Sequence, residues 1–270
     1  MKIRLLIPLL ALACGSSTEG DTSGKSGADD TGSSDTAGDS SSGSGVAGLA
    51  ALSSDDCPDL STSGTTSFVS SGRDRTVTAV VPSTVEENMP IVFFLHGLLD
   101  ASTSSPSAMM ASGLSLQSYA DQLGLIFVLP ESDLMSVGGF SFYMWTVDTT
   151  DGEDIILYDD LRTCASDQLG IDLDRVSAMG FSGGGLFTTV VARDRGDTLA
   201  SIVELSGGSD VTIPTFTGLF AEYDTPAYAM PALLMAGGAN DVWPGGGVTL
   251  VDFSAATDKL QGQLNDDGHF

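Results

Sequence analysis

Short unbroken runs of hydrophobic residues alternate along this chain with longer amphipathic stretches. The unbroken runs have the length of strands and lie at residues 68–81, 90–95, 125–129, 175–179, 200–205 and 231–236. The first run contains a turn at Gly72, so we expect it to form two antiparallel strands. Unbroken apolar runs are typical of strands that are buried on both faces, as in a parallel sheet.

The amphipathic stretches predict helices at residues 116–123, 154–169, 186–193 and 254–264. In the clearest of them, Leu157, Leu161 and Cys164 recur at helical spacing, and Gly170 is a typical stop. Strands that alternate with helices predict a doubly wound α/β domain with a mostly parallel sheet. The first two strands would form an antiparallel edge at its N-terminal side.

Residues 1–14 have the features of an export signal. Lys2 and Arg4 precede an apolar run that is too short to span a membrane and that ends at Ala13-Cys14. The segment resembles a bacterial lipoprotein signal, which implies a lipid anchor at Cys14; an ordinary secretory signal is the alternative. We expect an exported protein, either an outer-membrane or cell-surface lipoprotein or an extracellular protein.

Composition divides the rest of the chain into a tether and one domain. Residues 15–45 are almost entirely Ser, Gly, Thr and Asp, which cannot bury enough apolar surface to fold. We therefore expect a disordered tether over 15–56 and a single folded domain over 57–270. Cys57 and Cys164 lie in that domain, either as a disulfide or as separate thiols.

Charge and composition exclude several classes of function. The chain has 36 Asp and Glu against 10 Lys and Arg, and a net charge of −26 repels nucleic-acid phosphates. Three Cys and two His argue against a Cys/His zinc site. We expect no metal, no cofactor and no nucleic-acid partner, and a neutral or cationic substrate.

One motif carries candidate chemistry. Residues 180–184, Gly-Phe-Ser-Gly-Gly, match G-x-S-x-G between a predicted strand and a predicted helix, where the motif exposes a nucleophilic serine, here Ser182. Acyl transfer also needs N–H donors for the oxyanion, and we expect these from Gly183 and Leu98. His96 precedes the serine in the chain, so we expect it to anchor the Leu98 loop rather than to act as the base.

The candidate acid is Asp241. It follows the predicted strand over 231–236, at the end of the sheet where α/β proteins place functional side chains. Asp210, after the strand over 200–205, is the competing candidate, and Asp224 is a weaker one.

The chain resembles secreted α/β-hydrolase esterases. Residues 172–184 match the D-x-x-R-V-x-x-x-G-x-S-x-G-G segment of the polyhydroxybutyrate depolymerase and feruloyl-esterase branch, and the loop around His96 also fits. The resemblance covers roughly residues 67–270. It implies an α/β-hydrolase fold and a serine hydrolase that cleaves carboxylic esters, either of a polyester or of an aryl or acyl group.

The catalytic base is where the chain departs from this pattern. In this fold the base is a histidine after the acid, and the only histidine after Asp241 is His269. The predicted helix over 254–264 leaves no room for the last strand before His269, which therefore lies where that strand would begin. Either the terminus folds back and brings His269 to Ser182, or the base and the last strand lie beyond Phe270.

Two functions follow from these observations. The first is an ester hydrolase, in which aromatic residues near the site either bind the acyl or aryl group or pack in the core: Phe140, Phe142, Trp145 and Trp243. The second is a non-catalytic surface lipoprotein that keeps the hydrolase fold and binds a ligand.

Overall fold

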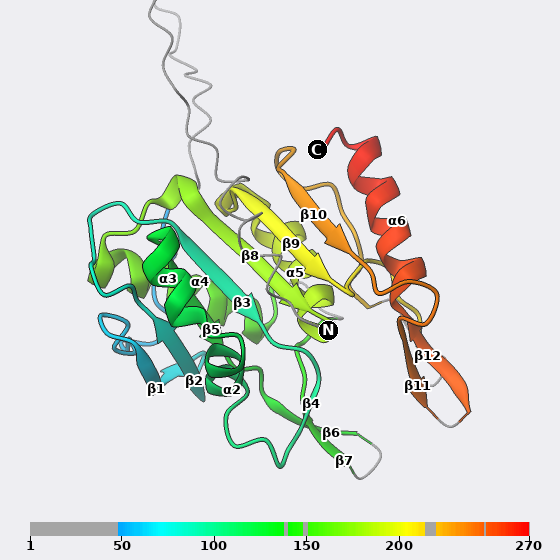
Figure 1. The fold of residues 1–270 in the computed structure, drawn as a ribbon, viewed down its shortest axis with the longest axis horizontal. Coiled ribbons are helices and arrows are strands. Elements are labelled where there is room, and N and C mark those ends of the chain that lie inside the picture. The colour runs from blue at the N-terminus through cyan, green and yellow to red at the C-terminus, as the bar shows by residue number, and fades with distance from the viewer. Residues whose placement is uncertain (1–47, 138–139, 148–150, 214–219, 246, 270) are drawn as a thin grey trace, which may run out of the picture.

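The computed structural model describes residues 48–137, 140–147, 151–213, 220–245 and 247–269. Its centre is a seven-stranded sheet with the strand order β1-β2-β5-β3-β8-β9-β10 (Figure 1). The strands are β1 Gly64–Ser70, β2 Arg73–Val80, β3 Ile91–Leu95, β5 Ile126–Pro130, β8 Val176–Phe181, β9 Ser201–Leu205 and β10 Ala232–Met235. The pairs from β5 to β10 are parallel and those of β1, β2 and β5 are antiparallel, which confirms the predicted sheet.

Helices cover both faces of this sheet. They are α2 Pro106–Gly113, α3 Leu116–Leu123, α4 Glu153–Leu169, α5 Gly183–Arg195 and α6 Phe253–Asp266. Alternate residues of β3 divide between two cores: Ile91 and Phe93 pack with α4, α5 and α6, whereas Val92 and Phe94 pack with α2 and α3. This alternation is the reason why the strand reads as an unbroken apolar run.

The four predicted helices are confirmed, but several smaller elements were missed. A three-stranded sheet joins β4 Leu99–Asp100, β7 Phe140–Tyr143 and β6 Leu134–Val137. Residues 242–252, expected as a loop, form a hairpin of β11 Val242–Gly245 and β12 Val248–Asp252. These strands are short and half exposed, so no strong hydrophobic pattern marks them.

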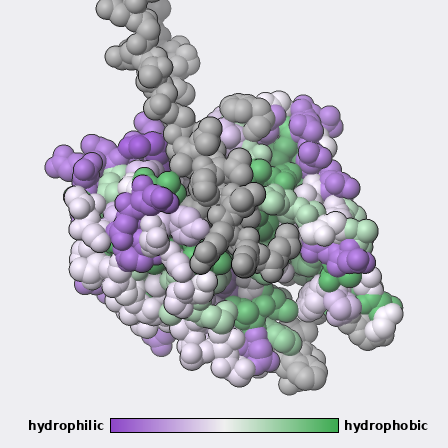
Figure 2. Space-filling view, viewed as in Figure 1, coloured by the Kyte–Doolittle hydropathy of each residue, from purple (hydrophilic) through white to green (hydrophobic). Residues whose placement is uncertain are grey.

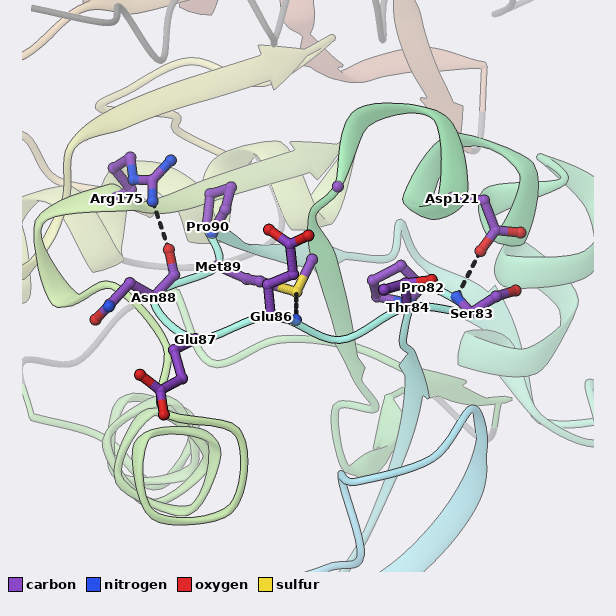
Figure 3. A pocket seen from close by; sticks show the side chains of 11 residues that line it. Pro82, Ser83, Thr84, Glu86, Glu87, Asn88, Met89, Pro90, Asp121 and Arg175 are labelled. Atoms are coloured by element: carbon purple, nitrogen blue, oxygen red, sulfur yellow. Dashed lines mark hydrogen bonds between the residues drawn. The ribbon is translucent and has the colours of Figure 1, made fainter.

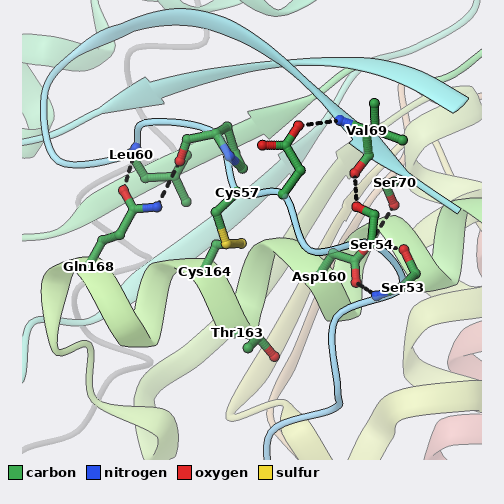
Figure 4. The surroundings of a disulfide bond; sticks show 12 residues. Ser53, Ser54, Cys57, Leu60, Val69, Ser70, Asp160, Thr163, Cys164 and Gln168 are labelled. Carbon is green, nitrogen blue, oxygen red and sulfur yellow. Dashed lines mark hydrogen bonds between the residues drawn. A yellow bond between two sulfur atoms is a disulfide. The ribbon is translucent and has the colours of Figure 1, made fainter. Parts of the chain in front are cut away.

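The N-terminal part of the described chain lies along α4 as a strap (Figure 4). A disulfide joins Cys57 to Cys164 on α4, which decides between the two states left open for these cysteines. Gln168 accepts from Leu60 N and donates to Pro58 O, both at 2.8 Å. Ser53 N donates to the carboxylate of Asp160 at 2.8 Å.

The strap corrects the predicted domain boundary at residue 57. Residues 48–56 are already bound to the domain, since Thr163 donates to Ala50 O at 3.0 Å. Cys14 and most of the predicted tether lie outside the described residues. Among the helices that the structure describes, none combines the length and the apolar character that a membrane span requires.

Candidate active site

Ser182 lies in a sharp turn between β8 and α5. Its backbone has φ +55° and ψ −118°, in a region that a residue with a side chain adopts only under strain. Ser182 N donates to Leu205 O at 2.8 Å, and Leu186 N donates to Ser182 O at 3.0 Å. Strained residues held by surrounding structure are concentrated at functional sites, and this turn matches the geometry that the motif predicts.

The glycines of the motif are required by close packing. A Cβ atom on Gly180 would lie 2.0 Å from Gly184 O, and one on Gly184 would lie 2.2 Å from Leu95 O. A Cβ atom on Gly185 would lie 2.7 Å from the Cα atom of Gly207. The start of α5 therefore contacts the ends of β3 and β9 at distances that no side chain permits.

The predicted oxyanion loop lies directly beside this turn. A Cβ atom on Gly97 would lie 3.2 Å from the Cβ atom of Ser182, and one on Gly183 would lie 3.3 Å from Leu98 N. Gly183 is the first residue of α5, where backbone N–H groups have no partner within the helix. The structure thus brings together Ser182, Gly183 and Leu98, as the sequence predicts.

His96 fixes the orientation of the loop. Ser132 N donates to His96 Nε2 at 3.0 Å, so the ring proton is on Nδ1, which lies 2.7 Å from Gly97 O. In a trans peptide the C=O and N–H groups point in opposite directions, so the N–H of Leu98 points away from the imidazole. Burial lowers the pKa of His96 to about 4, which keeps the ring neutral and makes it a weak base.

Trp145 connects this loop to the helix that follows the nucleophile. Its Nε1–H donates to His96 O at 2.7 Å, and its ring stacks on that of Phe187 in α5 with centroids 4.8 Å apart. The ring is 2 % exposed, so of the two roles predicted for the aromatic residues, Trp145 has core packing.

The other aromatic residues near the site are more accessible. Trp243 and Phe142 are half-buried, and the side chain of Phe140 lies outside the described residues. Phe181, which precedes the nucleophile, was not singled out in the sequence, yet 48 % of it is exposed. Figure 2 shows hydrophobic side chains gathered around β4, close to the end of β3.

Asp241 lies in a loop at the same end of the sheet as Ser182. Phe181, Leu205 and Met235 are aligned across β8, β9 and β10, and the loop to Asp241 follows Met235. The carboxylate of Asp241 accepts from Gly237 N at 2.7 Å.

The competing acid, Asp210, is already engaged in structural contacts. Lys259 Nζ lies 2.9 Å from its carboxylate, Gln263 donates to it at 2.8 Å, and Tyr223 N donates to it at 2.9 Å. A carboxylate with these partners is not available to orient a base, so the geometry favours Asp241.

His269 is the clear correction among the predicted site residues. Its Nδ1 lies 3.1 Å from Met230 O and 3.2 Å from Met230 N, and the side chain is buried. Met230 precedes β10, whereas Ser182 follows the far end of β8, a separation of roughly 20 Å along the strands at ~3.3 Å per residue. Figure 1 shows the C-terminus near the start of β10, so His269 does not fold back to Ser182.

A cavity of about 610 Å³ opens at the opposite end of the sheet (Figure 3). It lies between residues 82–90, Asp121 and Arg175. Two of its polar groups have partners within the wall: Asp121 accepts from Ser83 N at 2.7 Å, and Arg175 donates to Asn88 O at 2.5 Å. The cavity is therefore remote from Ser182 and does not contribute to the candidate active site.

Comparisons with solved structures define the class of fold. The chain is similar to pOPH and sOPH in their native forms, each with a TM-score of 0.56 over 74 % of this chain and 76 % of the other, at 15 % and 16 % identity. It is also similar to esterase 2 of Thermogutta terrifontis, with a TM-score of 0.53 and 13 % identity over 78 % of this chain and 82 % of that one. No family model and no curated protein matches the sequence. The chain has the α/β-hydrolase fold.

Proposed function

We propose that this protein is a serine hydrolase that cleaves carboxylic esters at Ser182. The observation that carries the proposal is the strained turn at Ser182, in which the next residue, Gly183, lies beside Leu98 N. This is the arrangement of a nucleophile beside an oxyanion hole. The esterase among the structural neighbours supports the same class.

In the proposed reaction, each group of the site has one role. The Ser182 hydroxyl attacks the ester carbonyl, and the negative charge on the carbonyl oxygen is stabilised by the N–H groups of Gly183 and Leu98. The base takes the proton of the Ser182 hydroxyl and gives it to the leaving alcohol as the tetrahedral intermediate collapses, and the acyl group stays on Ser182. Water then repeats the attack and releases the acid.

The base in this scheme is a group other than the chain's two histidines. His269 lies at the other end of the sheet, and both nitrogens of His96 are engaged, Nε2 with Ser132 N and Nδ1 with Gly97 O. A serine without an adjacent base is a weak nucleophile, so we expect slow acylation that a small base in solution accelerates. Asp241 would orient such a base.

The proposal extends to the class of substrate and to the location of the protein. The exposed Phe181 beside Ser182 and the net charge of −26 favour an uncharged ester with an apolar group, either a polyester or an aryl or acyl ester. The Cys57–Cys164 disulfide fits an exported protein, because oxidising compartments maintain such bonds. Anchoring through a lipid at Cys14 is part of the same proposal.

The test is labelling with a fluorophosphonate, which reacts with activated serines, followed by peptide mapping. We expect slow labelling at Ser182 that imidazole accelerates, none in Ser182→Ala, and unchanged labelling in His269→Ala. Absence of labelling in the folded protein with imidazole present would overturn the proposal. Loss of labelling in His269→Ala would restore His269 as the base.

The position of His269, away from Ser182, also favours a second candidate function, a binding protein that retains the hydrolase fold. The two candidates differ in turnover of p-nitrophenyl acetate. A hydrolase loses this turnover in Ser182→Ala, whereas a binding protein shows the same low rate in both forms.

A further inference from the structure

Glu204 is a buried carboxyl group that the proposed mechanism does not use. It lies on β9, beside the nucleophile strand, and is 1 % exposed. Burial of an acid without a cation beside it favours the uncharged form. Burial raises the pKa of Glu204 to about 8.

Glu204, Thr189 and Gly208 form a closed circuit of hydrogen bonds. Gly208 N donates to Glu204 Oε2 at 2.7 Å. Thr189 Oγ1, on α5, lies 2.8 Å from Glu204 Oε1 and 2.9 Å from Gly208 O. We call these three residues the Glu204 circuit.

Counting protons decides the state of Glu204. The Thr189 hydroxyl has one hydrogen, and Gly208 O can only accept it. If Thr189 donates to Gly208 O, the short contact between Thr189 and Glu204 needs a hydrogen from the carboxyl group. All three contacts are therefore satisfied only when Glu204 is protonated at Oε1.

The circuit joins two parts of the candidate active site. Thr189 belongs to α5, the helix that follows Ser182, and a Cβ atom on Gly208 would lie 2.2 Å from the carbonyl carbon of Ala256 in α6. At the start of α6, Phe253 N donates to Asp241 O at 2.9 Å. The loop with Gly208 thus packs between the nucleophile helix and the helix whose first residue holds Asp241.

We propose that Glu204 is a positioning residue that acts as an uncharged carboxylic acid and joins the Ser182 helix to the segment that carries Asp241. Its effect on catalysis rests on the proposed ester hydrolysis, whereas its protonation does not. Ionisation removes the hydrogen that Glu204 gives to Thr189 and leaves a buried carboxylate. The elements packed around it present Thr189 from α5, Gly208 from the loop, Gly180 from β8 and Leu234 from β10, none of which is charged.

The sign of the pH dependence follows from linkage. Between pH 4.5 and about 8, the folded chain holds a proton at Glu204 that the unfolded chain releases. The contribution of Glu204 to the free energy of unfolding therefore decreases over this range and levels off above it. The fraction of folded molecules in which the Glu204 circuit is closed decreases as the pH rises through about 8.

The experiment compares wild type with Glu204→Gln, because the amide can donate to Thr189 and accept from Gly208 at every pH. Thr189→Val removes the circuit. Thr188→Val is the matched control: Thr188 is equally buried on α5, and its hydroxyl donates to Gly184 O at 2.9 Å instead. Each variant is measured by urea unfolding against pH, by the infrared band of a protonated carboxyl group, and by fluorophosphonate labelling with imidazole.

We expect the wild-type carboxyl band to be absent in Glu204→Gln and to disappear above about pH 8. The free energy of unfolding of wild type minus that of Glu204→Gln should decrease between pH 4.5 and 8, and Thr188→Val compared with Glu204→Gln should show the same decrease. The labelling rate of wild type relative to Glu204→Gln should fall at least several-fold through pH 8.

Identical pH dependence of unfolding in wild type and Glu204→Gln would overturn the proposal. A constant ratio of labelling rates through pH 8 would overturn the positioning role. Failure of all variants to label, with the difference in unfolding intact, would support the protonated circuit and reject ester hydrolysis instead.

Discussion

The two sides of the candidate active site differ in how tightly they are packed. Around Ser182, the strand, turn and helix are in backbone contact, and the oxyanion loop is fixed by His96 and Trp145. On the side of Asp241, β10 is half exposed, and 52 % of Val248 in the hairpin that follows is exposed. Binding the oxyanion needs rigid N–H donors, and the proposed donors lie on the tightly packed side around Ser182.

The largest expected effect is that of Gly184→Ala on the Ser182 side. A Cβ atom there would lie 2.2 Å from Leu95 O and 2.5 Å from His96 O, so backbone must move. We expect a loss of at least about 4 kcal/mol in the free energy of unfolding, the range of the most disruptive single substitutions, and no fluorophosphonate labelling. Urea unfolding and labelling measure both.

The matched control is Gly262→Ala on α6. A Cβ atom at this exposed helical position would have nothing within 4 Å. Alanine should stabilise the helix by up to about 1 kcal/mol, with labelling unchanged. Equal effects of the two substitutions on the free energy of unfolding and on labelling would contradict the difference in packing between the two sides.

The next effect is a pH dependence from His96. Its pKa lies below the ordinary 6.5, at about 4, so the unfolded chain holds more protons between these values. The contribution of His96 to stability is therefore fully present above pH 6.5 and is lost as the pH falls through about 4. The total is about 3 kcal/mol at 1.36 kcal/mol per pKa unit.

Measured by urea unfolding, the free energy of unfolding of wild type minus that of His96→Asn should rise with pH between about 4 and 6.5. Parallel curves would mean that His96 does not titrate in this range and that another group causes the acid sensitivity.

Trp145→Phe should have a smaller effect on the same loop. The substitution keeps an aromatic ring on Phe187 but removes the N–H that donates to His96 O. An unsatisfied buried carbonyl costs about 1–3 kcal/mol, and we expect labelling at Ser182 to slow by roughly tenfold because the loop loses its fixed orientation.

Tyr158→Phe is the control for this loss. It removes a buried hydroxyl that lies 2.7 Å from Thr198 Oγ1, on a ring that packs against Phe93. It should destabilise the protein to a similar degree and leave the labelling rate unchanged. Slower labelling in both variants would show that the rate follows stability and not the orientation of the loop.

The same division explains what could be predicted from the sequence. Unbroken apolar runs such as residues 90–95 fix β3 and its neighbours, and G-x-S-x-G between a strand and a helix fixes the turn at Ser182, because both depend on local chemistry. The strap over 48–56 was missed, since polar contacts with distant residues hold it, and the hairpin of β11 and β12 was missed because its strands are short and half exposed. The proton on Glu204 could not be predicted, since it depends on three groups that only the fold brings together.

His269→Ala should have the smallest effect on activity. Order along the chain made His269 the candidate base, but its contact with Met230 places it at the amino end of β10. The substitution removes a buried ring that holds the end of α6, so we expect a loss of about 1–3 kcal/mol in stability. The imidazole-dependent labelling rate at Ser182 should stay within about twofold of wild type, because a twofold change corresponds to only ~0.4 kcal/mol in the barrier. A loss of labelling at a temperature where the variant is folded would show that His269 takes part in the chemistry after all.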